Sequence, residues 1–273
     1  MTIVEFFREL RKLVIDTIDP VHVRIDPLQS GTYISCGSQT SDIVLSAKLK
    51  GSVQGLDEPI VITTPKLLNA ILEGPDYRDG EIFASYSSTD LEQKFQFSNG
   101  RGSVTKMKVW AGSNLDNFVR MVNPSSGPWQ LVMPVTALWK QQFEYWSKHA
   151  PLIEDRCKAS FVSKEDALHC VVGDYNFDHH MWSCEAGEGA GFVSAISFSC
   201  SSMVKVLQLF PHVRRMSILV STEALVLVRA ESDNAEYSFY IRGEVPHWYK
   251  AARLPVCDID DPRSVLQQRQ DES

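Results

Sequence analysis

Four short amphipathic segments at nearly even spacing are the feature that most constrains how this chain can fold. Their periodicity predicts helices that begin near residues 3, 65, 135 and 202. The second begins at Thr64-Pro65, a capping residue followed by a proline, which is well tolerated at the first helical position. A fixed period of this kind predicts a repeated architecture before any motif is considered.

Strand-like runs fill the intervals between these helices in the same order twice, and most are bounded by Gly, Asp, Asn or Ser turns. A Ser-Thr turn recurs at matching places, at 88–91 in the first half and at 221–225 in the second. We therefore predict an α+β fold with two similar domains, each with two helices packed on antiparallel sheets. The predicted strands are 22–25, 32–36, 43–49, 60–63, 81–86, 91–97 and 104–110, then 157–162, 168–172, 179–184, 192–198, 216–221, 224–230 and 237–242.

The pattern places an N-terminal domain at 1–110, a connecting segment at 111–128, a C-terminal domain at 129–250 and an acidic, mobile tail at 251–273. The connecting segment is rich in Gly, Ser, Asn and Pro, as linkers are. It also holds large apolar residues, which a fully solvated linker seldom carries. We expect another surface to cover Leu115, Phe118, Val119, Met121 and Val122.

The composition, with 44% hydrophobic and 22% charged residues, excludes a wholly disordered, collagen-like or simple coiled-coil chain. A net charge of -7 means that any contact with nucleic acid must be local. No apolar run is long enough to span a membrane, and charged residues interrupt the start of the chain where a signal peptide needs apolar ones. We expect a soluble intracellular protein without a membrane partner, whose six cysteines are reduced core thiols.

The two-domain pattern resembles the DNA sliding clamps of the proliferating cell nuclear antigen type over about residues 1 to 250. The resemblance is carried by the first helix with its following strands and by Ser201–Leu207, Met216–Thr222 and Tyr237–Ile241. The length fits the two-domain subunits that close as a homotrimer rather than the three-domain bacterial clamp. Family members usually open with a strand before the first helix, for which Met1–Ile3 leaves little room. This departure predicts a divergent clamp of viral or phage origin, in the cytoplasm of a prokaryotic host or the nucleus of a eukaryotic one.

In this family the helices line the channel that encircles duplex DNA, without reading its sequence. The four helix segments together hold two more basic than acidic residues, although the whole chain is acidic. The alternative is that these cations belong to ordinary solvated helix faces. The predicted DNA-facing residues are Arg8, Arg11, Lys12, Lys66, Lys140, Lys148 and Lys205.

The resemblance also implies partners: a DNA polymerase, a clamp loader and further copies of the chain. Partner peptides dock in an apolar groove beneath the connecting segment, although that segment could instead pack only on its own sheet. The predicted groove residues are Ile43, Leu45, Leu115, Phe118, Val119, Met121, Val245 and Pro246. The strands at 102–110 and 179–185 are expected to pair between subunits, with Thr105, Met107, Val109, Met181 and Ser183 at the interface.

Histidines, cysteines and aspartates between 169 and 184 superficially resemble a metal-ligand set, but their spacing fits no zinc template. The chain has no phosphate-binding loop, nucleophile elbow or zinc-protease helix motif. We therefore expect no catalysis, metal or cofactor. The alternatives are a herpesvirus-type processivity factor that binds DNA without encircling it, which the negative charge disfavours, and an unrelated β-rich enzyme or capsid-type protein.

Overall fold

The computed structural model describes residues 1–40, 42–78, 82–89, 93–111, 129–149, 158–164, 167–172, 182–188, 196–221 and 225–244. The chain forms two compact units. Unit 1 holds 1–125, 208–216 and 229–240, and unit 2 holds 126–207, 217–228 and 241–273. Two segments from the C-terminal half, 208–216 and 229–240, therefore belong to unit 1. The division into domains at 1–110 and 129–250 stays a prediction.

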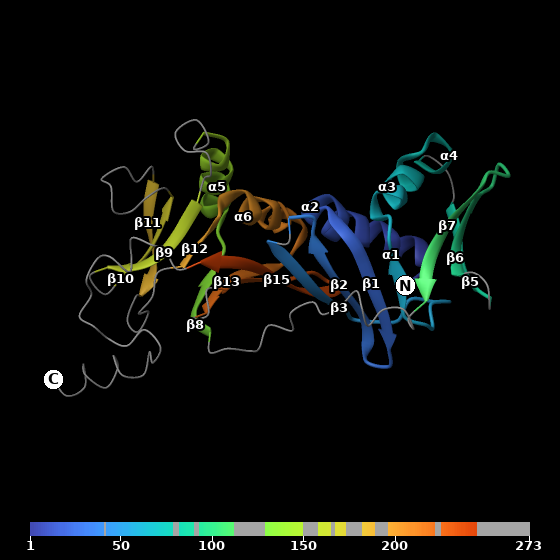
Figure 1. Cartoon of the computed structure of the whole chain (residues 1–273), viewed down its shortest axis with the longest axis horizontal. Helices are drawn as coiled ribbons and strands as arrows, with labels where there is room; N and C mark the ends of the chain where they lie inside the picture. The colour runs from blue at the N-terminus through green and yellow to red at the C-terminus, as the bar shows by residue number, and fades with distance from the viewer. Residues whose placement is uncertain are drawn as a thin grey trace. The chain divides into compact units, whose positions relative to one another are not determined.

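The first helical segment of unit 1 runs without interruption through α1 (Ile3–Leu10), a π-helical turn η1 (Arg11–Ile15) and α2 (Asp16–Ile18), close to the predicted helix (Figure 1). It begins with a capping box, in which the Thr2 backbone N–H donates to Glu5 Oε2 at 2.8 Å. The ring of Phe7 meets the ring of Phe95 edge-on at 4.7 Å between centroids. This contact holds the apolar face of α1 against the sheet.

Unit 1 also contains a second α-helix, α3 (Pro65–Glu73), and the short α4 (Pro75–Arg78). The buried residues Leu68, Ile71 and Leu72 form the apolar face of α3. After α4 begins, the Tyr77 hydroxyl donates to Thr105 Oγ1 at 2.9 Å, so α4 is fixed to the sheet by a hydrogen bond as well as by packing.

The strands of the N-terminal half lie in the antiparallel order β5-β6-β7-β4-β1-β2-β3 (Figure 1). A two-residue turn joins β1 to β2, and Gly31 there has φ 133°, a conformation that favours glycine. A Cβ at this position would lie 2.4 Å from the Leu49 carbonyl oxygen, so only glycine fits. The strands are β1 (Pro20–Leu28), β2 (Gly31–Ser38), β3 (Ile43–Leu49), β4 (Ile60–Ile62), β5 (Ile82–Ser88), β6 (Gln93–Asn99) and β7 (Val104–Ala111).

The C-terminal half repeats this arrangement, with strand order β13-β14-β15-β12-β9-β10-β11. Its core stacks aromatic rings from α5 (Ala137–His149) on the sheet, with Trp139 and Phe161 at 5.9 Å and Phe161 and Phe198 at 5.2 Å between centroids. The remaining helical elements are α6 (Cys200–Leu207) and a 3-10 turn, η4 (Phe210–His212). The strands are β9 (Lys158–Lys164), β10 (Ala167–Val172), β11 (Trp182–Glu188), β12 (Ile196–Ser199), β13 (Arg215–Ser221), β14 (Leu225–Glu231) and β15 (Ala235–Glu244).

One strand was not predicted. β8 (Trp129–Pro134) precedes α5 and pairs antiparallel with β13, whereas the first half begins directly with its helix. Apart from β8, each strand of one half has a counterpart in the other, and β7 and β3 correspond to β15 and β11 by their place in the order. The predicted α+β class with helices on antiparallel sheets is confirmed.

No helix in the described part of the chain is long and apolar enough to cross a membrane. Three of the cysteines, Cys36, Cys170 and Cys200, are buried. Burial raises the pKa of the Cys36 thiol far above its usual range, so this thiol stays protonated.

Candidate nucleic-acid interface and sheet edges

Two of the predicted DNA-facing cations lie on the exposed side of the first helical segment. Arg8 and Lys12 are four residues apart and therefore neighbours along one helical face. Neither forms an ion pair with any residue that the structure describes. Glu5 lies one turn before Arg8, and the hydrogen bond from the Thr2 backbone lowers the pKa of its carboxyl group. This face presents both signs of charge.

Arg11 has a different place from the one predicted. Its guanidinium forms ion pairs with Glu73 on α3 and, at 3.4 Å from Nε to Oδ2, with Asp16. Asn69 on α3 donates from Nδ2 to the same aspartate at 2.8 Å. The physical reason for the correction is this network: Arg11 ties η1 to α3, and two carboxylates already neutralise its charge.

Two more predicted cations are paired with nearby carboxylates. Lys66 lies 3.1 Å from Asp19 Oδ2, and Lys140 lies 3.7 Å from Glu144 one turn further along α5. Exposed pairs of this kind contribute little stability, but they reduce the local positive charge. Lys148, which is exposed, and the half-buried Lys205 form no ion pair within the described residues. Four of the seven predicted cations, Arg8, Lys12, Lys148 and Lys205, therefore form no ion pair with another residue of the described ranges.

The predicted peptide groove is not assembled by the described residues. Ile43 and Leu45 are both 0% exposed in the core of unit 1, because alternate residues of β3 point inward. They therefore offer no surface to a peptide, which corrects their assignment. The other six predicted groove residues lie outside the described residues: Leu115, Phe118, Val119, Met121, Val245 and Pro246.

The predicted interface strands have edges without a strand partner in the described chain. β4 pairs with β7 only at its end, through Ile60 with Ala111 and Val61 with Trp110. Residues 104–109 of β7 pair with β6 on one side, and no described strand lies on the other. β11 ends the strand order of the C-terminal half, with β10 as its one described neighbour. Each half thus has a length of strand edge that no described strand pairs with.

The side chains predicted for this interface need correction. Met107 and Val109 are 0% and 2% exposed, and Thr105 accepts the Tyr77 hydrogen bond, so all three face the helix-covered side of the sheet. Any pairing along β7 would use the backbone edge instead. Ser183 lies in β11, where it pairs in register with Val171, and Met181 lies outside the described residues.

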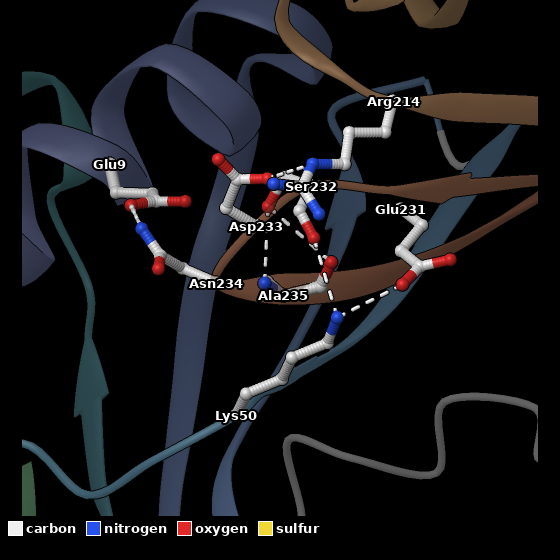
Figure 2. Close-up of polar contacts among 8 residues, drawn as sticks. All are labelled: Glu9, Lys50, Arg214, Glu231, Ser232, Asp233, Asn234 and Ala235. Atoms are coloured by element: carbon white, nitrogen blue, oxygen red, sulfur yellow. Dashed lines mark hydrogen bonds and ion pairs between the residues drawn. The ribbon is translucent and has the colours of Figure 1, made fainter.

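The start of β15 is held in unit 1 by a turn that sequence reasoning missed (Figure 2). The Lys50 backbone N–H donates to the Asn234 carbonyl at 2.8 Å, and Lys50 Nζ lies 3.0 Å from Glu231 Oε1. Asp233 pairs with Arg214, and Asn234 Nδ2 donates to Glu9 on α1 at 3.4 Å. β15 therefore begins at a fixed place beside β3.

A Ser-Asp-Asn turn between two strand-like runs is visible in the sequence, but its partners are not. Lys50 is 181 residues from Glu231, and Glu9 is 225 residues from Asn234. The Tyr237 hydroxyl also donates to Glu9, at 3.4 Å. Burial, and then the Glu9 charge, raises the pKa of this phenol well above its usual range, so it remains a donor.

Within the described residues, no group of three or more His, Cys, Asp or Glu side chains could hold a metal ion. His169 and Cys170, from the cluster considered in the sequence, lie in β10 opposite Glu185 and Cys184 of β11. Adjacent residues of a strand point to opposite faces, so the side chains of His169 and Cys170 cannot both bind one metal ion.

The two halves of the chain share one order of strands, and each carries helices on its sheet. No protein-family model matches the chain, and no curated protein sequence matches it. Several solved structures are similar to the chain. PCNA of Entamoeba histolytica is 12% identical with a TM-score of 0.60, over 88% of this chain and 94% of that one. A. fulgidus PCNA bound to the C-terminal region of FEN-1 is 11% identical with a TM-score of 0.57, over 89% and 96%.

A third structure, PCNA of Thermococcus kodakaraensis, is 12% identical with a TM-score of 0.57, over 87% of this chain and 97% of that one. The similarity covers nearly the whole length of all three clamps. The chain therefore has the PCNA-like clamp fold, as the sequence resemblance predicted.

Proposed function

We propose that this chain is a subunit of a sliding clamp, a homotrimeric ring that encircles duplex DNA and tethers a replicative polymerase. The PCNA-like fold supports the general class. The proposal that the subunits form a ring rests on a contrast between two strands. Both ends of β15 have strand partners, whereas one end of β7 has no described strand on one of its two sides.

The internal repeat suggests how that edge is completed. The end of β15 pairs with β12, and its start lies beside β3. The end of β7 pairs with β4 in the same way, but no described strand lies at the place that corresponds to β3. The strand equivalent to β3 in the C-terminal half is β11, whose outer edge likewise has no partner among the described strands. Pairing β7 of one subunit with β11 of the next repeats the internal junction, and a head-to-tail contact of this kind closes a ring when its rotation allows.

Inside the ring, the proposed duplex contacts are made by Arg8, Lys12, Lys148 and Lys205. Such contacts would be exchangeable phosphate contacts that carry no sequence information. The clamp acts without catalysis. The proposed partners remain a polymerase and a clamp loader, with the groove completed by the connecting segment and the residues after β15. A viral or phage source remains part of the proposal.

Topology provides the test. The subunits are cross-linked to one another while the protein is on a closed circular duplex. The DNA is then linearised with a restriction enzyme. A clamp remains on the circle at high salt and leaves the linear form by sliding off its ends, whereas a protein held by phosphate contacts leaves both at high salt. Sedimentation should give three times the 30.7 kDa subunit mass. A monomer at every concentration, with retention that ignores linearisation, would favour the herpesvirus-type alternative.

Two adjacent proline variants test the proposed edge. Successive residues of an antiparallel strand direct their N–H groups to opposite sides, so Thr105→Pro and Lys106→Pro each remove a donor from a different side of β7. The variant that keeps its β6 pairing should fold and lose the trimer. The other should lose stability. If both proline variants fold and both remain trimeric, the interface between subunits lies elsewhere.

A further inference from the structure

We propose that the outer edge of β5 binds an extended apolar peptide of a partner protein by strand addition. β5 ends the strand order of the N-terminal half, and β6 is its one neighbour among the described strands (Figure 1). We call this edge, residues 82–88, the β5 edge. The ring proposed above pairs β7 with β11 and does not use β5, so the inference stands apart from the clamp proposal.

The internal repeat indicates what kind of partner fits beside β5. β5 and β13 each begin the strand order of their half. β13 has β8 on its outer side, with Leu219 opposite Val132. The residues before α1 do not take the equivalent place, because Met1 accepts a hydrogen bond from the Gln54 N–H and Thr2 caps the helix. No described strand of the N-terminal half therefore corresponds to β8.

Burial differs between these two equivalent strands. Residues 218–220 of β13, beside β8, are no more than 4% exposed. In β5 every residue is at least partly exposed, and Phe83 is 53% exposed. Even Ala84 is only half-buried, although its partner on β6 is Phe97, which is 0% exposed. A strand in the place of β8 would cover these residues on both faces of the sheet.

β5 also lacks the features that normally protect an edge. Natural edge strands carry charged side chains, prolines or bulges that prevent further pairing. β7 carries Lys106 and Lys108, β11 carries Glu185 and Glu188, and β8 ends at Pro134. β5, with the sequence IFASYSS, has no charged residue and no proline, and it pairs with β6 without a register shift. Its backbone is therefore suited to strand addition, in which main-chain hydrogen bonds supply the affinity.

The same comparison favours a separate apolar peptide over a second copy of β5. β8 places residues 131–133, Leu-Val-Met, opposite residues 218–220 of β13. A second β5 would instead offer serine at three of its seven positions. Because successive residues of a strand alternate between the two faces, consecutive apolar residues can pack beside Phe83 on one face and beside Ile82 and Ala84 on the other. The partner is thus an uncharged strand with consecutive large apolar residues.

The test uses a labelled synthetic peptide with the β8 sequence, Trp-Gln-Leu-Val-Met-Pro, extended by lysines at both ends for solubility. Fluorescence anisotropy measures its binding to the full chain. An added strand donates only alternate N–H groups to its neighbour. We compare peptides that are N-methylated at Leu131 and Met133 or at Gln130 and Val132. One should bind about 30-fold more weakly, through two lost hydrogen bonds, and the other within about two-fold of the unmodified peptide.

A pair of lysine variants locates the site on the protein. Ser85→Lys puts a charge at the middle of the β5 edge, as protected edges have, and should weaken peptide binding about five-fold or more. Ser46→Lys is the matched control, because Ser46 is also exposed but lies on β3, which has β2 and β15 on its two sides. It should change the affinity by less than about two-fold. Circular dichroism checks that both variants are folded.

Hydrogen exchange identifies what occupies the edge. Alternate amides of β5 should exchange quickly in the protein alone and about ten-fold or more slowly with the peptide bound. Slow exchange of these amides without peptide at every protein concentration would show that the chain covers its own edge. Protection that appears only with rising protein concentration, together with a doubled mass, would identify a second copy. Equal binding of the two N-methylated peptides, or no effect of Ser85→Lys, would also overturn the inference.

Discussion

The two halves of the chain share one strand order but differ in how their edges are completed. In the C-terminal half, β8 lies beside β13, and the start of β15 lies beside β3. In the N-terminal half, no described strand lies outside β5, and the start of β7 has only β6 beside it. An open edge is a site for further pairing. Among the described strands, β7 in the N-terminal half and β11 in the C-terminal half each have an edge without a strand partner.

The halves also differ in how their helices are held together. In the first, the Arg11 network joins η1 to α3. In the second, the Lys140–Glu144 pair lies within α5, while aromatic rings hold the helix to the sheet. Both halves pack aromatic rings of their first helix on the sheet, and the first half adds an ion-pair network between helices.

The largest expected effect tests whether the two cores contribute equally. Phe7 and Phe143 are both 0% exposed, each on the first helix of its half. Replacing either with alanine should lower the free energy of unfolding by about 3–5 kcal/mol, through lost burial and a cavity. Urea unfolding measures it. A loss below 1 kcal/mol at one site would mean that this half is not packed around its phenylalanine.

A smaller effect should distinguish the two kinds of helix contact. Arg11→Glu places a third carboxylate beside Asp16 and Glu73 and should destabilise the protein by about 1–2 kcal/mol. Lys140→Glu breaks only an exposed pair one turn apart and should cost about 0.5 kcal/mol. Thermal unfolding compares them. Adding Glu73→Lys to Arg11→Glu should restore part of the loss, and no restoration would argue against the network.

The helix caps should differ in the same direction. Thr2 forms a reciprocal capping box with Glu5, whereas Thr136 accepts only a 3.4 Å hydrogen bond from Trp139 N–H. Thr2→Ala should therefore cost about 1 kcal/mol, and Thr136→Ala should cost less. Chemical denaturation of both variants gives the comparison. A larger loss at Thr136 would reverse it.

The smallest effect concerns pH at the turn of Figure 2. The Lys50 hydrogen bond lowers the pKa of the Glu231 carboxyl, so this contact stabilises the fold above the unfolded pKa and is lost as pH falls through the lowered one. Lys50→Gln should lower the melting temperature slightly at pH 7, and its effect should become smaller as pH falls and the Glu231 carboxyl is protonated. An effect that keeps its size as pH falls would show that the contact is not ionic.

The local periodicity of the sequence predicted most of the elements. Helices expected near 3, 65, 135 and 202 begin at Ile3, Pro65, Ala137 and Cys200, and β3 has the predicted bounds. The reason is physical: a face that must be buried imposes a period of 3.6 on a helix and 2 on a strand, and that period is written in nearby residues. β8 was not predicted because its apolar run is short, follows a linker-like segment and ends in a proline.

Tertiary structure decided which of these elements meet and which charges remain available. Arg11 and Lys12 are adjacent and equally basic in the sequence, but only Arg11 meets Glu73, 62 residues away. From the sequence, Ile43 and Leu45 were predicted to line the groove. In the structure, their strand lies between β2 and β15 and their side chains are buried. The open edges of β7 and β11 likewise follow from the order of the sheet. Pairings between distant segments depend on how the whole chain closes, because no local period specifies which strand lies next to which.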